Sequence, residues 1–199
     1  LRWLQYSLFT PLFRNHSADG TRLQELYQFD NIASAAEMIK IRYALIPYLY
    51  SEFLKAALND EMMFRPLAFD FPEDNTAKQA EDQLFLGNEL MIAPIYKQNA
   101  QGRYVYLPEE MMMISMKSVN DYTAAVLPAG HHYVEAPLDT LVFFIRKGKA
   151  IPFGTAADNT SQIDMSALRL LGYDGSTYEL YSDNGYSPEP EDSLKITTL

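Results

Sequence analysis

A single long amphipathic pattern restricts the possible folds of this chain more than any other feature. Apolar residues recur at helical spacing over Ile32–Leu58, and Asp30 or Asn31 can cap the start of the helix. The apolar face is broad enough to pack against a sheet. Pro47 lies inside the pattern, and because proline lacks an N–H group and clashes with the preceding turn, we expect a bend over residues 43–47.

The residues before this helix give a weaker pattern. Residues 1–9 are typical of the end of a helix that stops near Pro11, since proline disfavours helix at the residue before it. Residues 12–29 show no sustained period and contain turn formers, which predicts an ordered loop. The sequence has no initial Met and begins inside a helical pattern, so we expect the true N-terminus to lie upstream.

After residue 59 the pattern changes to short apolar runs separated by turn signals, which is typical of an antiparallel β-sandwich. A linker-like composition at residues 153–163 indicates a second boundary. We therefore expect three parts, residues 1–60, 61–153 and 154–199. The predicted strands are residues 62–71, 84–86, 89–95, 103–107, 111–116, 132–136, 141–146, 168–173 and 177–181, and residues 75–83 have a helical period.

Charge and composition exclude several classes of partner. The net charge of −10 comes from 26 acidic and 16 basic residues, and its field opposes nucleic acid and anionic membranes. The absence of cysteine removes disulfides and thiolate metal sites. No apolar stretch is long enough for a membrane span, and no signal peptide is visible, which favours a cytoplasmic location while the compartment stays open. A homo-oligomer also stays open.

The most suggestive cluster of polar side chains is Arg14 and His16, in the loop that follows residues 9–11. A loop after a short apolar segment can project a guanidinium and an imidazole together into a cleft. Both groups donate hydrogen bonds to hydroxyls or to a carboxylate without having to titrate. The residues alone leave a structural role and a ligand role equally open.

Other polar clusters favour structural roles. The adjacent His131 and His132 would point to opposite faces of a strand and have no third ligand nearby, so we expect a hairpin edge, no metal and no cofactor. Turn chemistry predicts hairpin turns at residues 173–176 and 183–185. Solvated charge is expected at Asp70, Glu73, Asp74, Glu81 and Asp82, and apolar core at Met111, Met112, Met113 and Met116.

Several segments, taken in order and at their spacing, resemble glycoside hydrolase family 31. The resemblance covers residues 1 to about 185. The segments are residues 2–5 (Arg-Trp-Leu-Gln), 9–16 (Phe-Thr-Pro-Leu-Phe-Arg-Asn-His), 20–22 (Gly-Thr-Arg), 42–50 (Arg-Tyr-Ala-Leu-Ile-Pro-Tyr-Leu-Tyr), 64–67 (Phe-Arg-Pro-Leu), 82–95, 104–108 and 144–152.

The resemblance implies an α+β chain that joins the last helix-strand-helix elements of a (β/α)8 barrel, residues 1–60, to antiparallel β-sandwich domains. These are a proximal sandwich, residues 61–153, and a distal segment, residues 154–199. It places His16 on substrate hydroxyls and Arg14 near the nucleophilic carboxylate. The family's nucleophile follows a Trp by two residues, whereas the only tryptophan, Trp3, is followed by Leu4 and Gln5. The catalytic carboxylates are therefore expected outside this chain.

The implied function is part of a retaining α-glucosidase that hydrolyses terminal α-linked glucose of small glucosides in carbohydrate metabolism. Its partners would be the α-glucoside substrate and the N-terminal and barrel portion of the same enzyme. An α-xylosidase is an alternative, because the residues that choose the substrate lie mostly on earlier loops. A second alternative is a structural module. A third is a carbohydrate-binding β-sandwich, which predicts a row of exposed aromatic residues on one sheet face.

The resemblance also has a consequence for stability. Without the rest of a barrel, the apolar face over Ile32–Leu58 is expected to be exposed and to drive association. We therefore expect the helical part to be marginal and the β region to resist proteolysis better.

Overall fold

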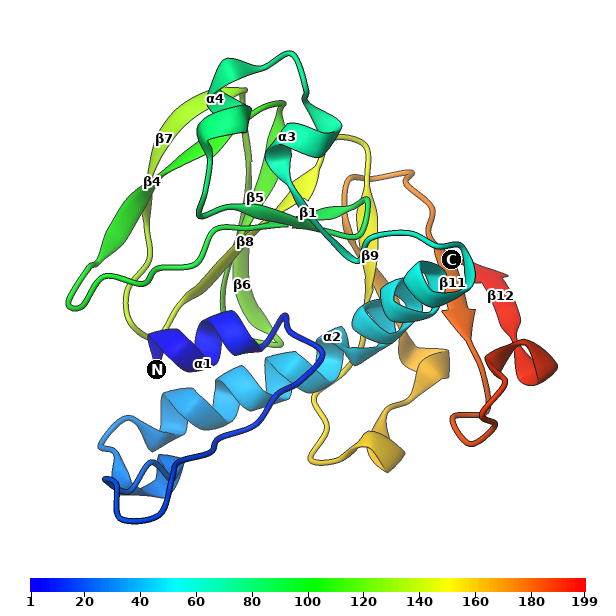
Figure 1. Cartoon of the computed structure of the whole chain (residues 1–199), viewed down its shortest axis with the longest axis horizontal. Helices are drawn as coiled ribbons and strands as arrows, with labels where there is room; N and C mark the ends of the chain where they lie inside the picture. Colours follow the sequence, from blue (N-terminus) through cyan, green and yellow to red (C-terminus); the bar gives the residue numbers. More distant parts are fainter.

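The structure is a computed structural model that describes residues 1–199, with the long helix in the first third and mostly strands in the rest (Figure 1). α1 spans Arg2–Ser7 and α2 spans Ile32–Leu58. The short helices α3, Leu67–Asp70, and α4, Asn75–Gln79, follow the first strand. Single 3-10 turns lie at Leu26–Gln28, Thr160–Gln162, Met165–Ala167 and Pro190–Ser193. None of these helices has both the length and the apolar character needed to cross a bilayer.

All strand pairs are antiparallel, which confirms the predicted class of sheet. A six-stranded sheet has the order β1-β2-β3-β8-β5-β6, and three further pairs are β4–β7, β9–β10 and β11–β12. The bounds are β1 Phe64–Pro66, β2 Leu84–Leu86, β3 Leu90–Ile92, β4 Gly102–Leu107, β5 Met111–Ser118, β6 Asp121–Leu127, β7 Gly130–Glu135, β8 Leu141–Arg146, β9 Ala150–Phe153, β10 Arg169–Gly172, β11 Glu179–Ser182 and β12 Lys195–Thr198.

The middle strands of the six-stranded sheet are largely buried on both faces, and alternation along them directs successive side chains to one of two cores. Phe143 and Ile145 of β8 join α2 in the larger core, while Phe144 between them points to the smaller core. The smaller core lies under the β4–β7 ribbon and α3, and contains Val105, Leu107, Val134 and Leu67. The sheet is thus the middle layer between α2 and the ribbon.

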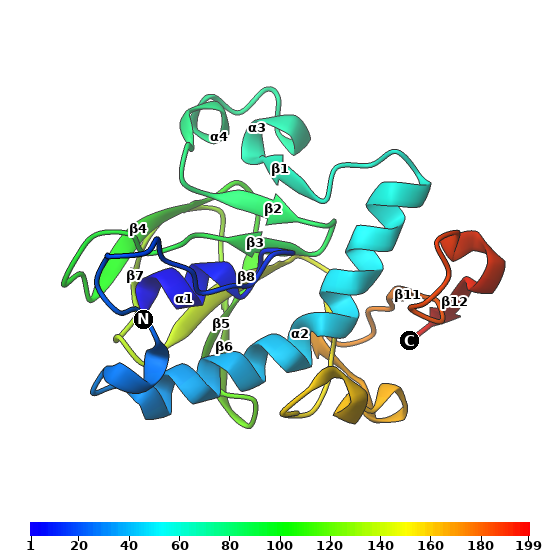
Figure 2. The ribbon, with the colours of Figure 1, turned by 60° about the horizontal axis from the view of Figure 1, so that its bottom comes forward.

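α2 is continuous but bent, as its internal proline predicts. Figure 2 shows the axis turning near the middle of the helix, which contains Pro47. Asn31 is the N-cap, although its side chain makes no capping hydrogen bond. One turn before the proline, the carbonyl of Ala44 accepts a 2.8 Å hydrogen bond from the N–H of Gly154, just after β9. The bend therefore serves as a docking point for the end of β9.

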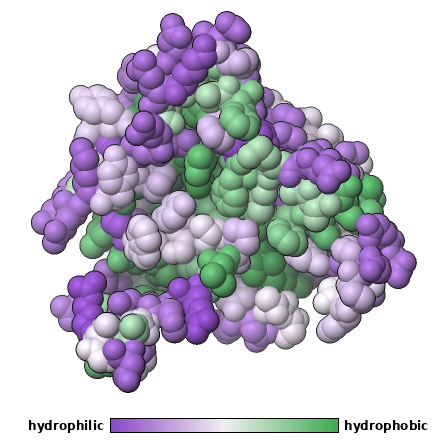
Figure 3. Space-filling model, viewed as in Figure 1, coloured by the Kyte–Doolittle hydropathy of each residue, from purple (hydrophilic) through white to green (hydrophobic).

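The expectation that the apolar face of α2 would be exposed is wrong for most of that face, although Ile32, Tyr50 and Phe53 are exposed. Met38, Ile41, Leu45 and Tyr48 are fully buried in the larger core, because α2 lies across the β region itself. In the space-filling view, apolar residues gather over the middle of the face seen in Figure 1, between hydrophilic margins (Figure 3). Large apolar side chains also remain exposed outside α2, and those of α1 and the following loop include Trp3, Leu12, Leu23, Tyr27 and Phe29.

The structure differs from the sequence-based predictions in four other respects. No strand forms within residues 1–60, which hold helix, loop and helix, because residues 10–31 have no strand beside them to pair with. The predicted strand at residues 62–71 is shortened to β1, since α3 begins after Pro66. The turn at residues 173–176 joins strands of different pairs, so it is not a hairpin; β6, β9 and β12 were absent from the predicted strands.

Limited proteolysis with trypsin should cut the chain first after Arg14 or Arg22. Both arginines are exposed in the loop between α1 and α2, whereas the inner face of α2 is buried and its backbone is hydrogen-bonded. Mass spectrometry of the early fragments identifies the sites. Lys40 is a matched control, because its side chain is partly exposed on α2. A first cut after Lys40 would contradict the packing of α2 on the β region.

Candidate functional site

The structure brings the two predicted site residues together at an exposed position. Nη2 of Arg14 lies 3.3 Å from Nδ1 of His16, and both side chains are open to solvent. The side-chain amide of Asn15, between them, donates to the carbonyl of Gln24 on the returning arm of the loop. The intervening residue is therefore fixed while the guanidinium and the imidazole remain available to a ligand.

Arg42 of α2 positions the start of this loop. Its Nη1 donates to the carbonyls of Leu8 and Thr10 at 2.6 and 2.7 Å, and its Nη2 donates to Pro11 at 3.2 Å. The guanidinium also lies 5.5 Å from the centre of the Phe13 ring. Sequence reasoning did not single out Arg42, although a charged residue within an otherwise apolar helix pattern is a signal for such a contact.

A cavity of about 490 Å³ lies beside the loop. Its polar lining residues are Ser7, Arg14, Asn15, Arg22 and Gln24, and apolar side chains that include Trp3 and Phe29 supply the rest. Its volume is within the usual range for small-molecule sites, and two guanidinium groups favour hydroxyl-rich or anionic ligands. His16 is not among the lining residues and stands at its edge beside Arg14.

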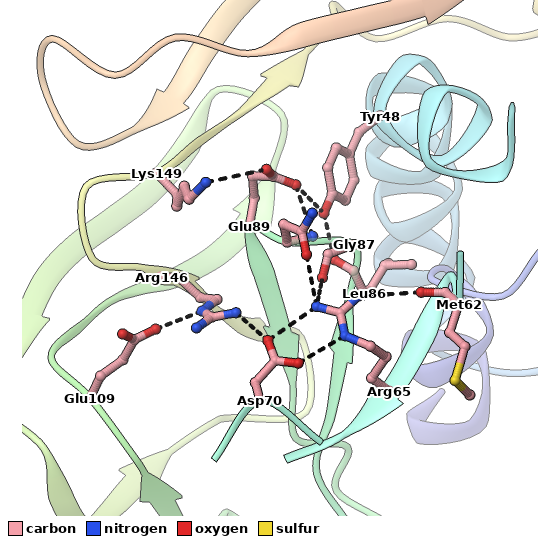
Figure 4. Close-up of polar contacts among 11 residues, drawn as sticks. Tyr48, Met62, Arg65, Asp70, Leu86, Gly87, Glu89, Glu109, Arg146 and Lys149 are labelled. Atoms are coloured by element: carbon pink, nitrogen blue, oxygen red, sulfur yellow. Dashed lines mark hydrogen bonds and ion pairs between the residues drawn. The ribbon is translucent and has the colours of Figure 1, made fainter. Parts of the chain in front are cut away.

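The acidic residues expected to be solvated are largely engaged in contacts. Asp70 accepts from Nε of Arg65 at 2.9 Å, from Nη2 of Arg65 at 3.1 Å and from Nη1 of Arg146 at 2.5 Å (Figure 4). Nε of Arg146 also donates to Glu109 at 2.6 Å. Burial raises the pKa of Asp70, but the hydrogen bonds and charges of the two arginines outweigh it and lower the pKa overall.

Asp74 and Asp82 were also expected to be solvated, and this expectation is wrong because both make contacts within the protein. Asp74 caps α4 by accepting from the backbone N–H groups of Thr76 and Ala77. Asp82 forms an ion pair with Arg103, with 2.6 Å between Oδ1 and Nη2. Only Glu73 and Glu81 of the group are exposed without such contacts. The contacts of Asp70, Asp74 and Asp82 therefore help to hold the β region together.

A second pair of carboxylates, missed from the sequence, is buried where α2 meets β3. Glu52 and Glu89 are 4% and 8% exposed. Oε1 of Glu52 accepts from Tyr178 at 2.6 Å and from Lys55 at 2.8 Å. Oε2 of Glu89 accepts from the Tyr48 hydroxyl at 3.3 Å (Figure 4). Burial closes both to a sugar, so this pair is structural, and no spacing in the sequence links residues so far apart.

Burial is the main cause of the shifted pKa values of Glu89 and of two tyrosines beside it. Burial raises the pKa of Glu89, and the negative charge of Glu52 raises it further, against the opposing charges of Lys55 and Lys149. Burial and the same carboxylates raise the pKa of Tyr48 and of the Tyr178 hydroxyl. Both tyrosines are therefore neutral donors at physiological pH, as the hydrogen bonds to the carboxylates require.

Gly87 lies against the same pair and cannot carry a side chain without disturbing it. Its φ is +62°, a left-handed conformation that favours glycine. A Cβ built on Gly87 would lie 2.2 Å from Oε2 of Glu52 and 2.5 Å from the hydroxyl of Tyr48. The turn between β2 and β3 thus packs directly on the buried carboxylate.

The remaining candidates have structural roles. His131 and His132 lie on β7, where the ring of His132 bonds the carbonyl of Pro128 at 2.7 Å. No group of three or more metal-binding side chains lies together. The prediction of apolar core is confirmed for Met111 and Met116, which are fully buried, and Met112 and Met113 pack partly buried against the two cores.

Two family models match consecutive parts of the chain. One is described as the glycosyl hydrolases family 31 TIM-barrel domain and matches residues 1–52. The other is described as the glycosyl hydrolase family 31 C-terminal domain and matches residues 60–151. The loop with Arg14 and His16 falls in the first match, and the six-stranded sheet falls in the second.

Curated relatives match almost the whole chain. It is 34% identical to alpha-glucosidase 2 of Bacillus thermoamyloliquefaciens over 98% of its length, and 31% identical to lysosomal alpha-glucosidase of Mus musculus over 94%. These matches cover 25% and 22% of the two relatives. The chain therefore spans about a quarter of the length of the curated relatives that it matches.

Solved structures share the fold over the full chain. An alpha-xylosidase of the family from Xanthomonas citri superposes with a TM-score of 0.83 at 26% identity, covering 100% of this chain and 22% of that one. A dextranase of the family from Flavobacterium johnsoniae, complexed with isomaltotriose, gives 0.80 at 27% identity, covering 99% and 25%. Relatives of similar structure thus act on different sugars.

Proposed function

The chain belongs to glycosyl hydrolase family 31, and from that premise we propose that it is part of a retaining α-glucosidase acting on terminal α-linked glucose of small glucosides. In this proposal residues 1–60 form the C-terminal edge of the catalytic barrel. Residues 61–153 form the proximal β-sandwich and residues 154–199 the distal β segment. The rest of the enzyme supplies the other barrel strands.

The observation that carries the proposal is the match to α-glucosidases along nearly the whole chain, with Arg14 and His16 brought together in the matched barrel segment. His16 would donate to substrate hydroxyls at the cleavage point, and Arg14 would lie near the nucleophilic carboxylate. Arg42 would act indirectly, because it holds the carbonyls of Leu8, Thr10 and Pro11 and so fixes where the loop starts.

The preference for glucose over xylose is tested by kinetics of the complete enzyme. We expect kcat/KM for 4-nitrophenyl α-glucoside to exceed that for the corresponding α-xyloside by more than about tenfold, since a site that hydrogen-bonds a hydroxyl discriminates against a substrate lacking it. The reverse preference would favour the α-xylosidase alternative, which the structural similarity to the Xanthomonas citri enzyme supports. Measuring both substrates in one preparation makes the ratio independent of the active fraction.

The 199-residue chain alone should not hydrolyse 4-nitrophenyl α-glucoside. Retaining hydrolysis needs two carboxyl groups about 5 to 5.5 Å apart across the scissile bond, one attacking the anomeric carbon and one protonating the leaving oxygen. The loop of Arg14 and His16 offers hydrogen-bond donors but no such pair, and Glu52 and Glu89 are buried. Release of nitrophenol above the background rate, by the chain purified to a single species, would contradict the proposed division of roles.

A further inference from the structure

The outer face of the β4–β7 ribbon carries four aromatic rings in two neighbouring cross-strand pairs. Tyr104 and Tyr133 are directly opposed, with ring centroids 5.3 Å apart, and the next pair on the same face is Tyr106 and His131 at 4.9 Å. These residues share one face because alternate residues of a strand point to the same side. Tyr104 is 71% exposed and Tyr133 is 56% exposed. We refer to these four residues as the aromatic row.

The aromatic row is held in place from below. The hydroxyl of Tyr106 donates to Oδ2 of Asp74 at 2.5 Å. The ring of Tyr133 lies against Gly102 on the opposite strand, where a Cβ would come within 3.0 Å of the tyrosine hydroxyl and 2.3 Å of the Val134 carbonyl. The ring thus occupies space that any other residue at position 102 would fill. Rings that are fixed before binding lose little conformational entropy when a ligand arrives.

Polar groups stand beside the rings, around a shared cavity of about 310 Å³. Tyr104 and Tyr133 line it together with Asp82, Tyr96 and Arg103. Asp82 pairs with Nη2 of Arg103 at 2.6 Å and accepts from the Tyr96 hydroxyl at 2.9 Å. A carboxylate offers about four lone-pair positions, so Asp82 retains acceptor capacity toward the cavity.

We propose that this surface binds an α-glucan oligosaccharide, with sugar rings stacked on Tyr104 and Tyr133 and hydroxyls bonded to Asp82 and Arg103. The C–H face of a pyranose is apolar and suits an exposed ring, while its edge presents hydroxyls that need both donors and acceptors. The surface combines these two chemistries. The net charge of −10 opposes a polyanion. The choice of an α-glucan rests on the proposed function; the binding itself does not involve Arg14 or His16.

Affinity electrophoresis of the 199-residue chain tests the proposal. Native gels containing soluble dextrin are compared with gels containing no polysaccharide and with gels containing hydroxyethylcellulose, and dissociation constants come from migration against polymer concentration. We expect dextrin alone to retard the chain. Tyr104→Ala and Tyr133→Ala should each raise the dissociation constant for dextrin by about tenfold or more, because each removes one stacking ring. Tyr104→Phe should bind like the unchanged chain.

Two control variants test whether retardation depends on the aromatic row itself. Tyr186→Ala removes a tyrosine that is 94% exposed in the connection between β11 and β12, and it should leave retardation unchanged. His16→Ala tests the competing sugar position, the loop of Arg14 and His16, and is compared with the Tyr104 and Tyr133 variants. Should Tyr104→Ala fail to fold by circular dichroism, Tyr104→Val keeps an apolar residue suited to a strand and removes only the ring.

The outcomes that overturn the proposal are distinct from failure of the proposed function. Equal migration with and without dextrin, or retardation lost with His16→Ala and kept with Tyr104→Ala and Tyr133→Ala, would exclude the aromatic row as the sugar site. Equal retardation by hydroxyethylcellulose would exclude an α-glucan preference. Hydrolysis of α-glucosides by the complete enzyme is measured separately. Sugar binding by the aromatic row can therefore be found in an enzyme that does not hydrolyse α-glucosides, and hydrolysis can be found without such binding.

Discussion

Replacing His16 by alanine in the complete enzyme should lower kcat/KM for 4-nitrophenyl α-glucoside by roughly 30- to 1000-fold, or about 2 to 4 kcal/mol. Hydrogen bonds to hydroxyls near the anomeric carbon strengthen as the oxocarbenium-like transition state forms, so their loss acts on the rate. Stability should change by less than about 0.5 kcal/mol, because the exposed ring makes one polar contact, 3.3 Å from Arg14.

His132→Ala is the matched control for this variant. It removes a histidine that also bonds a neighbour, the carbonyl of Pro128, but that lies on β7 away from the loop of His16. Its kinetics should match those of the unchanged enzyme. A His16 that only braces the loop predicts a lower melting temperature with kcat/KM nearly intact. That result, from kinetics and melting measured on the same preparation, would remove His16 from the site.

Gly87→Ala should destabilise the 199-residue chain by about 3 to 7 kcal/mol. The left-handed φ of +62° costs about 1 kcal/mol for alanine. The new methyl group would also collide with Glu52, 2.2 Å away, and with the Tyr48 hydroxyl, adding about 1 to 3 kcal/mol of overpacking. Displacing Glu52 from Tyr178 and Lys55 leaves a buried charge poorly paired, for about 1 to 3 kcal/mol more.

Gly175→Ala isolates the backbone part of this effect. Gly175 has a similar φ of +75°, but a Cβ there meets nothing within 4 Å, so we expect a loss of only about 1 kcal/mol. Urea unfolding followed by circular dichroism gives both values, and with a slope of about 1 to 3 kcal/mol per molar the midpoints should differ visibly. Equal midpoints for the two variants would show that the buried carboxylate moves aside at little cost.

The elements predicted from the sequence are those whose own residues carry a strong period. Ile32–Leu58 forms one helix, and its internal Pro47 marks the middle where the axis bends. β8 is recognised by its continuous apolar residues. β9 is equally buried but was missed, since it has four residues and contains Pro152, which is unfavourable inside a strand. β6 and β12 were missed because their side chains are mostly exposed, so no apolar alternation identifies them.

Contacts between distant residues could not be predicted from spacing. Tyr178 bonds Glu52 across 126 positions, and Arg146 bonds Asp70 across 76 positions. The solvated charge expected at Asp70 was therefore wrong, because its partners come from another part of the chain. The same limit applies to α2, which we expected to be exposed: its covering sheet is built from residues that follow it.

In the candidate site, too, neighbouring residues could be predicted from the sequence and contacts between distant residues could not. Arg14 and His16 are two residues apart, so a local pattern could bring them to attention, and the structure places them in contact distance. Their role in catalysis remains a prediction. Arg42, which holds the loop, acts through three backbone carbonyls whose positions no residue type reveals.

The shared core of α2 has a consequence for recombining parts of related enzymes. The barrel match ends at residue 52, inside α2, and the C-terminal match begins at residue 60. Yet Ile41, Leu45 and Tyr48 pack in one core with Phe143 and Ile145. A crossover placed at the border between the two matches would pair a helix from one parent with a sheet from another. The inherited unit of this fold therefore runs across that border, and residues 32–58 belong with the strands they cover.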